Sequence, residues 1–209
     1  TYIQGGRQFL QETDNTYDLV VLDAYKRDKV PFQLTTREFM DLVTERLSPD
    51  GMAVANIISS SSGPASEFYR AEYKTMNASF GQVYAFPTSD TGAIQNIELV
   101  ATKSDTRLTQ EQLRERNQDR EIGIDLADAI DGYTTDVPTE DVPVLRDDRA
   151  PVDRLLDSMV GQRYVIEETG SGSGDDDTNT TEPAAAWGDP ALTVRDGGAV
   201  TRGQGLHIR

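Results

Sequence analysis

The sequence has 209 residues and a formal net charge of −16, from 36 acidic and 20 basic residues. This excess of acid disfavours binding to nucleic acid through phosphates, and it favours solubility and attraction of cationic partners. The absence of cysteine excludes disulfides, thiolate catalysis and cysteine-ligated zinc. The single histidine, His207, stands near the end of the chain, so histidine acid–base chemistry and histidine metal clusters are also not expected.

The first predicted unit is a strand, a turn and a helix. Residues 1–3 have the character of a strand end, residues 4–6 of a turn, and a short helix begins at Arg7. The continuous apolar run 19–22 then predicts a parallel strand covered by helices on both faces, because it lacks the alternation of a half-exposed strand. Asp23 follows directly. Ligands of open α/β sheets bind beyond the carboxyl ends of the strands, which makes Asp23 the leading candidate for chemistry. A turn aspartate that accepts backbone N–H groups is the alternative.

Helices and strands alternate after Asp23. Thr35 and Glu38 have capping-box spacing, which predicts a helix from about Thr36 to Leu47. The elements expected next are a strand, a helix and two further strands, at residues 52–58, 65–80, 83–86 and 97–102. The last two strands predict an antiparallel hairpin at the sheet edge.

The C-terminal half differs in composition. Residues 104–169 contain 17 acidic and 8 basic residues, yet they retain signals for short helices and for a strand at 164–166. We therefore predict an extension packed on a core domain formed by residues 1–103. Residues 170–209 are a low-complexity linker and a Gly-rich run, which predicts a disordered tail. The aspartates at 175–177 lack the ligand spacing of a calcium loop, so no metal site is predicted.

Three N-terminal segments resemble the polyamine aminopropyltransferases, the spermidine/spermine synthase family: Gly6-Arg7-Gln8-Phe9-Leu10, Tyr17 to Tyr25, and Val30 to Phe39. The segment Leu145 to Asp153 resembles the closing motif of the synthase-like branch of that family. The resemblance covers residues 1–169. It implies an α/β fold, the C-terminal half of a class I methyltransferase-like (Rossmann-like) sheet, with parallel strands and an antiparallel edge hairpin. It also implies a partial chain that lacks the N-terminal half of the family.

The family resemblance implies a reaction. An aminopropyl group passes from decarboxylated S-adenosylmethionine, a co-substrate and not a resident cofactor, to a small cationic amine such as putrescine or spermidine. Asp23 matches the family's base or amine anchor, which suits an ammonium that must lose a proton before its nitrogen attacks. The implied nucleoside-binding residues are Gly5, Gly6, Arg7, Pro31 and Phe32.

Further candidates for substrate binding are loop residues. They are Tyr25, Asp28, Asp90, Asp147 and Asp148. Each has an ordinary alternative, namely a solvated loop acid, a cap, or an aromatic side chain that anchors a loop.

The chain also departs from the resembled family. Gly5 replaces an acid that contacts adenine, Lys26 replaces a second acid of the amine site, and the glycine-rich first strand and the ribose-binding acid are absent. These departures predict weak nucleoside binding and an inactive fragment of a longer protein. They keep open two alternatives, a non-catalytic synthase-like module and an S-adenosylmethionine-dependent methyltransferase.

The acidic composition predicts a salt-adapted cytoplasmic protein that does not bind nucleic acid. A membrane segment is expected, if anywhere, only in a missing region before Thr1. The sequence leaves a homodimer open.

Overall fold

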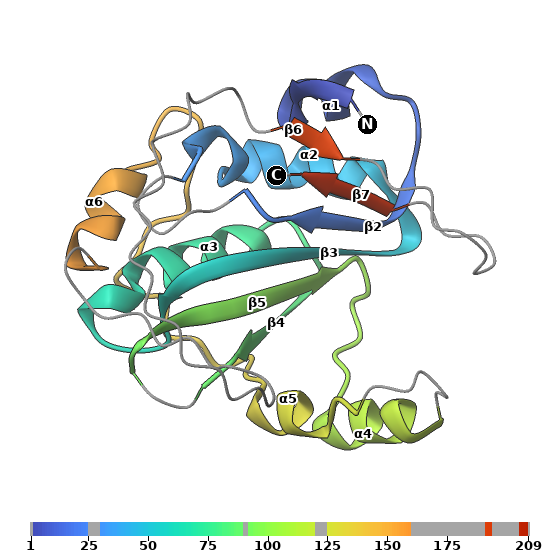
Figure 1. The fold of residues 1–209 in the computed structure, drawn as a ribbon, viewed down its shortest axis with the longest axis vertical. Helices are drawn as coiled ribbons and strands as arrows, with labels where there is room; N and C mark the ends of the chain where they lie inside the picture. Colours follow the sequence, from blue (N-terminus) through green and yellow to red (C-terminus); the bar gives the residue numbers. More distant parts are fainter. Residues whose placement is uncertain are drawn as a thin grey trace, which may run out of the picture.

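The computed structural model describes residues 2–24, 30–89, 92–119, 125–159, 191–193 and 205–208. Helices and strands alternate through the first half of the chain (Figure 1). The elements are β1 (Tyr2–Gly5), α1 (Gly6–Glu12), β2 (Tyr17–Leu22), η1 (Phe32–Leu34), α2 (Arg37–Arg46), β3 (Leu47–Ser60), η2 (Pro64–Ser66), α3 (Glu67–Asn77), β4 (Gln82–Pro87), β5 (Ile94–Thr102), α4 (Gln110–Asp119), α5 (Ala127–Gly132), α6 (Val152–Leu156), η3 (Asp157–Met159), β6 (Ala191–Thr193) and β7 (Gly205–Ile208).

The strands form one sheet in the order β1-β6-β7-β2-β3-β5-β4. Strand β2 pairs in parallel with both β3 and β7, whereas β5 pairs antiparallel with β3 and β4. The α/β fold and the antiparallel β4–β5 edge confirm the predicted fold class. Strand β3 extends past both ends of the predicted 52–58 strand.

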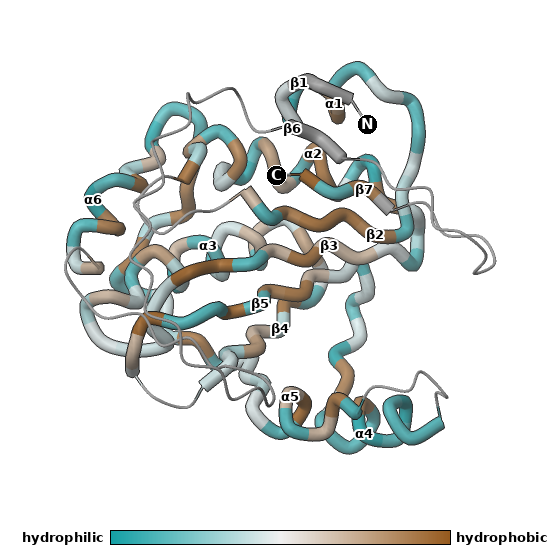
Figure 2. Tube along the Cα trace, viewed as in Figure 1, coloured by the Kyte–Doolittle hydropathy of each residue, from teal (hydrophilic) through white to brown (hydrophobic). Residues whose placement is uncertain are grey.

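The side chains on the two faces of β2 differ in burial. Val20 and Leu22 are fully buried on the face that α2 and α3 cover, but Leu19 on the opposite face is 36% exposed (Figure 1). Figure 2 shows the hydrophobic character of this strand. Among the described residues, helices cover only one face of β2 at this position, so the prediction of helices over both faces is wrong here. Within the described residues, the second face is covered at the β4 edge, where the Tyr133 ring lies 5.9 Å from that of Tyr84.

The start of α2 differs by one residue from the capping-box prediction. Its N-cap is Thr36, whose side chain accepts a hydrogen bond from the Phe39 backbone N–H at 3.4 Å. Thr35 instead donates from its hydroxyl to the Phe32 carbonyl, which closes η1. Glu38 accepts from the backbone N–H of Asp147 and does not complete a capping box.

The segment 142–159 packs into the same hydrophobic core as the sheet and its helices. Its buried core residues are Val142, Leu145, Val152, Leu155, Leu156 and Met159. The Leu145 backbone N–H also donates to Thr75 of α3 at 2.9 Å. This packing is consistent with an extension built onto the core, and the division at residue 103 stays a prediction.

Strands β6 and β7 lie within the segment expected to be a disordered tail. The structure differs there because β2 offers an unpaired edge, which an extended segment can complete, and β7 alternates Leu206 and Ile208 into the core. A Cβ on Gly6 would stand 2.5 Å from Cγ2 of Ile208, so the close packing here requires a glycine. The other residues of 170–209, and the strand predicted at 164–166, lie outside the described residues.

Candidate functional site

Asp23 lies directly after β2, at the carboxyl end of this parallel strand. Its side chain is 41% exposed. Its backbone N–H donates to the Ile208 carbonyl at 2.8 Å, and one carboxylate oxygen accepts from the Asn56 amide at 3.3 Å. Asp23 therefore has the strand-end position that the sequence predicted, while its chemical role stays a prediction.

His207 is brought to Asp23 by the fold. Strand β7 pairs with β2 in a register that sets His207 beside Val21, and the His207 Nε2 lies 3.5 Å from the carboxylate of Asp23. The position of His207 near the end of the chain did not indicate this contact. Sequence reasoning missed this contact because nothing local to the tail predicts which strand edge it joins.

Glu98 is a further acid of this region that the sequence did not single out. Strand β3 lies between β2 and β5, and the register pairs Asn56 with Glu98. Burial, together with the nearby charge of Asp23, raises the pKa of Glu98 from 4.5 to about 7. The signal available in the sequence was a glutamate between two aliphatic residues, Ile97 and Leu99, of a predicted strand.

The Glu98→Gln variant is expected to be more stable than wild type above pH 7. The raised pKa means that the folded state holds a proton on Glu98 that the unfolded state releases above pH 4.5. The free energy of unfolding of the wild type therefore falls as pH rises from about 4.5 to about 7. Allowing for solvent screening, the gain at pH 8 should be about 1 kcal/mol.

Urea unfolding of both proteins at pH 4 and pH 8 measures this difference. It should vanish at pH 4, where both states of the wild type hold the proton. An equal difference at both pH values would instead show that the substitution acts through packing.

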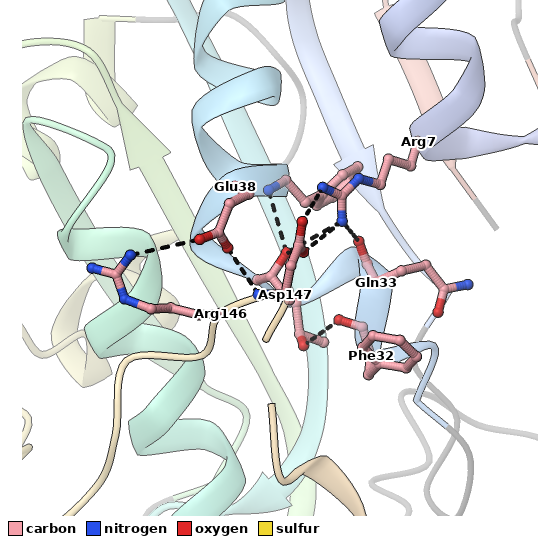
Figure 3. Close-up of polar contacts among 9 residues, drawn as sticks. Arg7, Phe32, Gln33, Glu38, Arg146 and Asp147 are labelled. Atoms are coloured by element: carbon pink, nitrogen blue, oxygen red, sulfur yellow. Dashed lines mark hydrogen bonds and ion pairs between the residues drawn. The ribbon is translucent and has the colours of Figure 1, made fainter. Parts of the chain in front are cut away.

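A second polar cluster joins residues that the sequence assigned to two different ligands. Arg7 of α1 donates to both carboxylate oxygens of Asp147, at 2.7 and 2.6 Å, and Thr36 donates to the same carboxylate at 2.6 Å (Figure 3). The Arg7 hydrogen bonds hold the pKa of Asp147 below its usual range. Glu38 extends the cluster by an ion pair with Arg146 at 3.6 Å. The predicted nucleoside residue Arg7 and the predicted substrate residue Asp147 therefore bind each other.

The remaining candidates that the structure describes differ in exposure, and Gly6 among them is buried. Pro31 precedes η1, and the side chain of Phe32 is 51% exposed. Gly5 is the N-cap of α1, and Asp148 is exposed in the loop after Leu145. Tyr25, Asp28 and Asp90 lie outside the described residues.

Two other features bear on ligands. A cavity of about 450 Å³ lies between the loop after β3 and α3, lined in part by Ser61, Gly63, Arg70 and Asp141. It contains none of the predicted site residues. The described part of the chain shows no group of three or more metal-ligating side chains, and it has no helix long and apolar enough to cross a membrane.

The fold and the position of Asp23 define a class of protein. It is an α/β protein with a mixed sheet, and it carries an acid at the carboxyl end of a central parallel strand. No family model matches the sequence.

Comparison with curated proteins narrows this class. The chain is 28% identical over 190 residues to a probable polyamine aminopropyl transferase of Bifidobacterium longum (strain NCC 2705), an alignment that covers 80% of this chain and 42% of that protein. It is 37% identical over 70 residues to a polyamine aminopropyltransferase of Vibrio vulnificus (strain CMCP6), covering 34% of this chain and 22% of that one. These relatives confirm the resemblance to the spermidine synthase family. The chain spans less than half the length of either relative.

Solved structures of similar fold include two spermidine synthases. A probable spermidine synthase from Corynebacterium glutamicum ATCC 13032 has a TM-score of 0.44 and 18% identity, covering 56% of this chain and 44% of that one. The spermidine synthase from Thermotoga maritima has a TM-score of 0.40 and 16% identity, covering 56% and 38% respectively.

Proposed function

We propose that this chain carries the amine-binding side of a polyamine aminopropyltransferase, with decarboxylated S-adenosylmethionine as co-substrate and putrescine or spermidine as acceptor. The observation that carries the proposal is the partly exposed carboxylate of Asp23 at the carboxyl end of β2, in a chain similar to an aminopropyltransferase over 80% of its length. A carboxylate in this position suits a cationic acceptor, and the net charge of −16 favours its approach.

Asp23 has two tasks in the proposed reaction. It first holds the acceptor ammonium through a charge-assisted hydrogen bond. It then takes a proton, so that the nitrogen lone pair can attack the carbon beside the sulfonium of the co-substrate. The new C–N bond forms as the C–S bond breaks, and the sulfur leaves as a neutral thioether on the nucleoside.

We further propose that the 209-residue chain transfers aminopropyl groups slowly or not at all by itself. Its sequence has no counterpart of the glycine-rich strand or of the ribose-binding acid of the resembled family. In the proposed amine half of the site, by contrast, Asp23 is the acid that would bind the acceptor.

A substrate panel tests the proposal. The purified chain is incubated with putrescine or spermidine and either decarboxylated S-adenosylmethionine or S-adenosylmethionine, and mass spectrometry identifies the products. In parallel, spermidine binding is measured by calorimetry. Aminopropylated product, or spermidine binding that depends on Asp23, supports the proposal. Methylated product would favour a methyltransferase, and absence of both binding and product would contradict the proposal.

A second candidate, a non-catalytic synthase-like module, is favoured by the contact of His207 with Asp23. The His207 Nε2 lies 3.5 Å from one carboxylate oxygen of Asp23, so an acceptor amine that binds this oxygen would have to compete with the imidazole. Removing the side chain with His207→Ala separates the two functions. Tighter spermidine binding by the variant supports a substrate site that the tail covers, whereas unchanged absence of binding supports the module.

A further inference from the structure

Asp147 is the centre of a clamp, which we define as Arg7, Thr36 and Asp147. The Arg7 guanidinium and the Asp147 carboxylate meet in a two-pronged arrangement, which is the strongest common geometry for this pair. The two residues are 140 positions apart in sequence. The clamp therefore connects the segment that contains Asp147 to α1 and to the start of α2 (Figure 3).

Arg7 also reaches the backbone of η1. Its Nη1, which binds Asp147, donates to the carbonyl oxygen of Gln33 at 3.2 Å. Gln33 is the middle residue of this three-residue turn, which is closed by the hydrogen bond from the Leu34 N–H to the Pro31 carbonyl at 2.9 Å. The same turn presents the exposed ring of Phe32. The guanidinium of Arg7 thus connects the carboxylate of Asp147 to the carbonyl group of Gln33, the residue that follows Phe32.

We propose that Asp147 is a positioning residue, which holds Arg7 so that η1 presents Phe32 to the nucleoside of the co-substrate. This inference rests on the proposed function for its ligand and on the clamp for its mechanism. Without Asp147, Arg7 loses two charge-assisted hydrogen bonds and its long side chain regains rotamer freedom. The remaining bond to the Gln33 carbonyl then has to order a mobile side chain by itself.

The hydrogen bonds of Asp147 argue against direct contact with a cationic substrate. Both of its carboxylate oxygens are bound by Arg7, and one of them also accepts from Thr36. These hydrogen bonds stabilise the ionised carboxylate and lower the pKa of Asp147. A substrate ammonium that bound the remaining lone pair of Oδ2 would lie beside the positive charge of Arg7.

Hydrogen exchange tests the positioning role in the full chain. In the Asp147→Asn variant, protection of the Leu34 and Thr35 amides against exchange is expected to fall by about tenfold. The charged hydrogen bonds between Arg7 and Asp147 are lost, and this weakens the hydrogen bond from Arg7 to the Gln33 carbonyl. The matched control is Asp141→Asn, which breaks another two-pronged pair, with Arg70, that does not contact η1. Amides of β3 report global stability.

Three outcomes of the exchange experiment are decisive. Loss of protection confined to η1 in Asp147→Asn, absent in Asp141→Asn and partly restored in Asp147→Glu, supports the proposal. Unchanged protection of η1 overturns it. Equal loss in η1 and β3 also overturns it, because the clamp would then only stabilise the whole fold.

The ligand is tested separately, with adenosine as the probe in ligand-observed NMR at millimolar concentration. Asp147→Asn should weaken adenosine binding about tenfold while leaving spermidine binding unchanged. Weaker spermidine binding instead, or no adenosine binding by the wild type, overturns the assignment to the nucleoside. Adenosine binding that depends on Asp147, in a chain that neither binds spermidine nor transfers aminopropyl groups, would sustain this inference and contradict the proposed function.

Discussion

Asp23→Asn is expected to lower aminopropyl transfer by about 10²–10⁴-fold, the usual contribution of a positioned general base. The substitution keeps the size of the side chain but removes its charge and its ability to accept the proton. Spermidine binding should weaken at least about tenfold as well, because the ammonium loses a charged partner. Steady-state rates and calorimetry on any preparation that shows transfer or binding measure the two effects.

Asp18→Asn provides the matched control for Asp23→Asn. Asp18 lies on the same strand and is exposed at the other end, where it accepts a hydrogen bond from Ser48 at 2.6 Å. The Asp18→Asn substitution changes the net charge by the same amount as Asp23→Asn. It therefore corrects for the general attraction of the polycation spermidine to an acidic protein. Equal losses in both variants would place the amine elsewhere on the surface.

Phe39→Ala is expected to have the largest effect on stability. Phe39 is fully buried on the inner face of α2, and truncating a buried phenylalanine costs about 3–5 kcal/mol through lost burial and the cavity left behind. That loss is a large part of the 5–15 kcal/mol by which a typical domain is stable. The variant should therefore unfold at a much lower urea concentration.

Phe32→Ala is the control for this stability measurement. Phe32 is 51% exposed, so its truncation should change the free energy of unfolding by no more than about 0.5 kcal/mol. A destabilisation by Phe32→Ala comparable to that of Phe39→Ala would contradict the solvent-facing position of the Phe32 ring.

The individual helices and strands of the first half of the chain were predictable from local patterns of apolar residues. The apolar run 19–22 predicted a strand, and the apolar stripe that includes Phe39 predicted both a helix and its inner face, because such a stripe follows the period of the helix. The strand-end position of Asp23 followed from the same pattern. Cover over the second face of β2 was not predictable, since a continuous apolar run reports burial without showing which segment supplies it.

Sequence patterns were sufficient to predict the α/β class, the antiparallel edge of the sheet, the acid after β2 and the resemblance to the polyamine aminopropyltransferases. The partners of the polar residues, by contrast, became known from the folded chain. The pairing of Arg7 with Asp147 joins residues 140 positions apart, and His207 reaches Asp23 through the pairing of β7 with β2. The physical reason is that hydrogen bonds and ion pairs form between whichever groups the fold brings within about 3–4 Å, and this proximity leaves no periodic trace in the sequence.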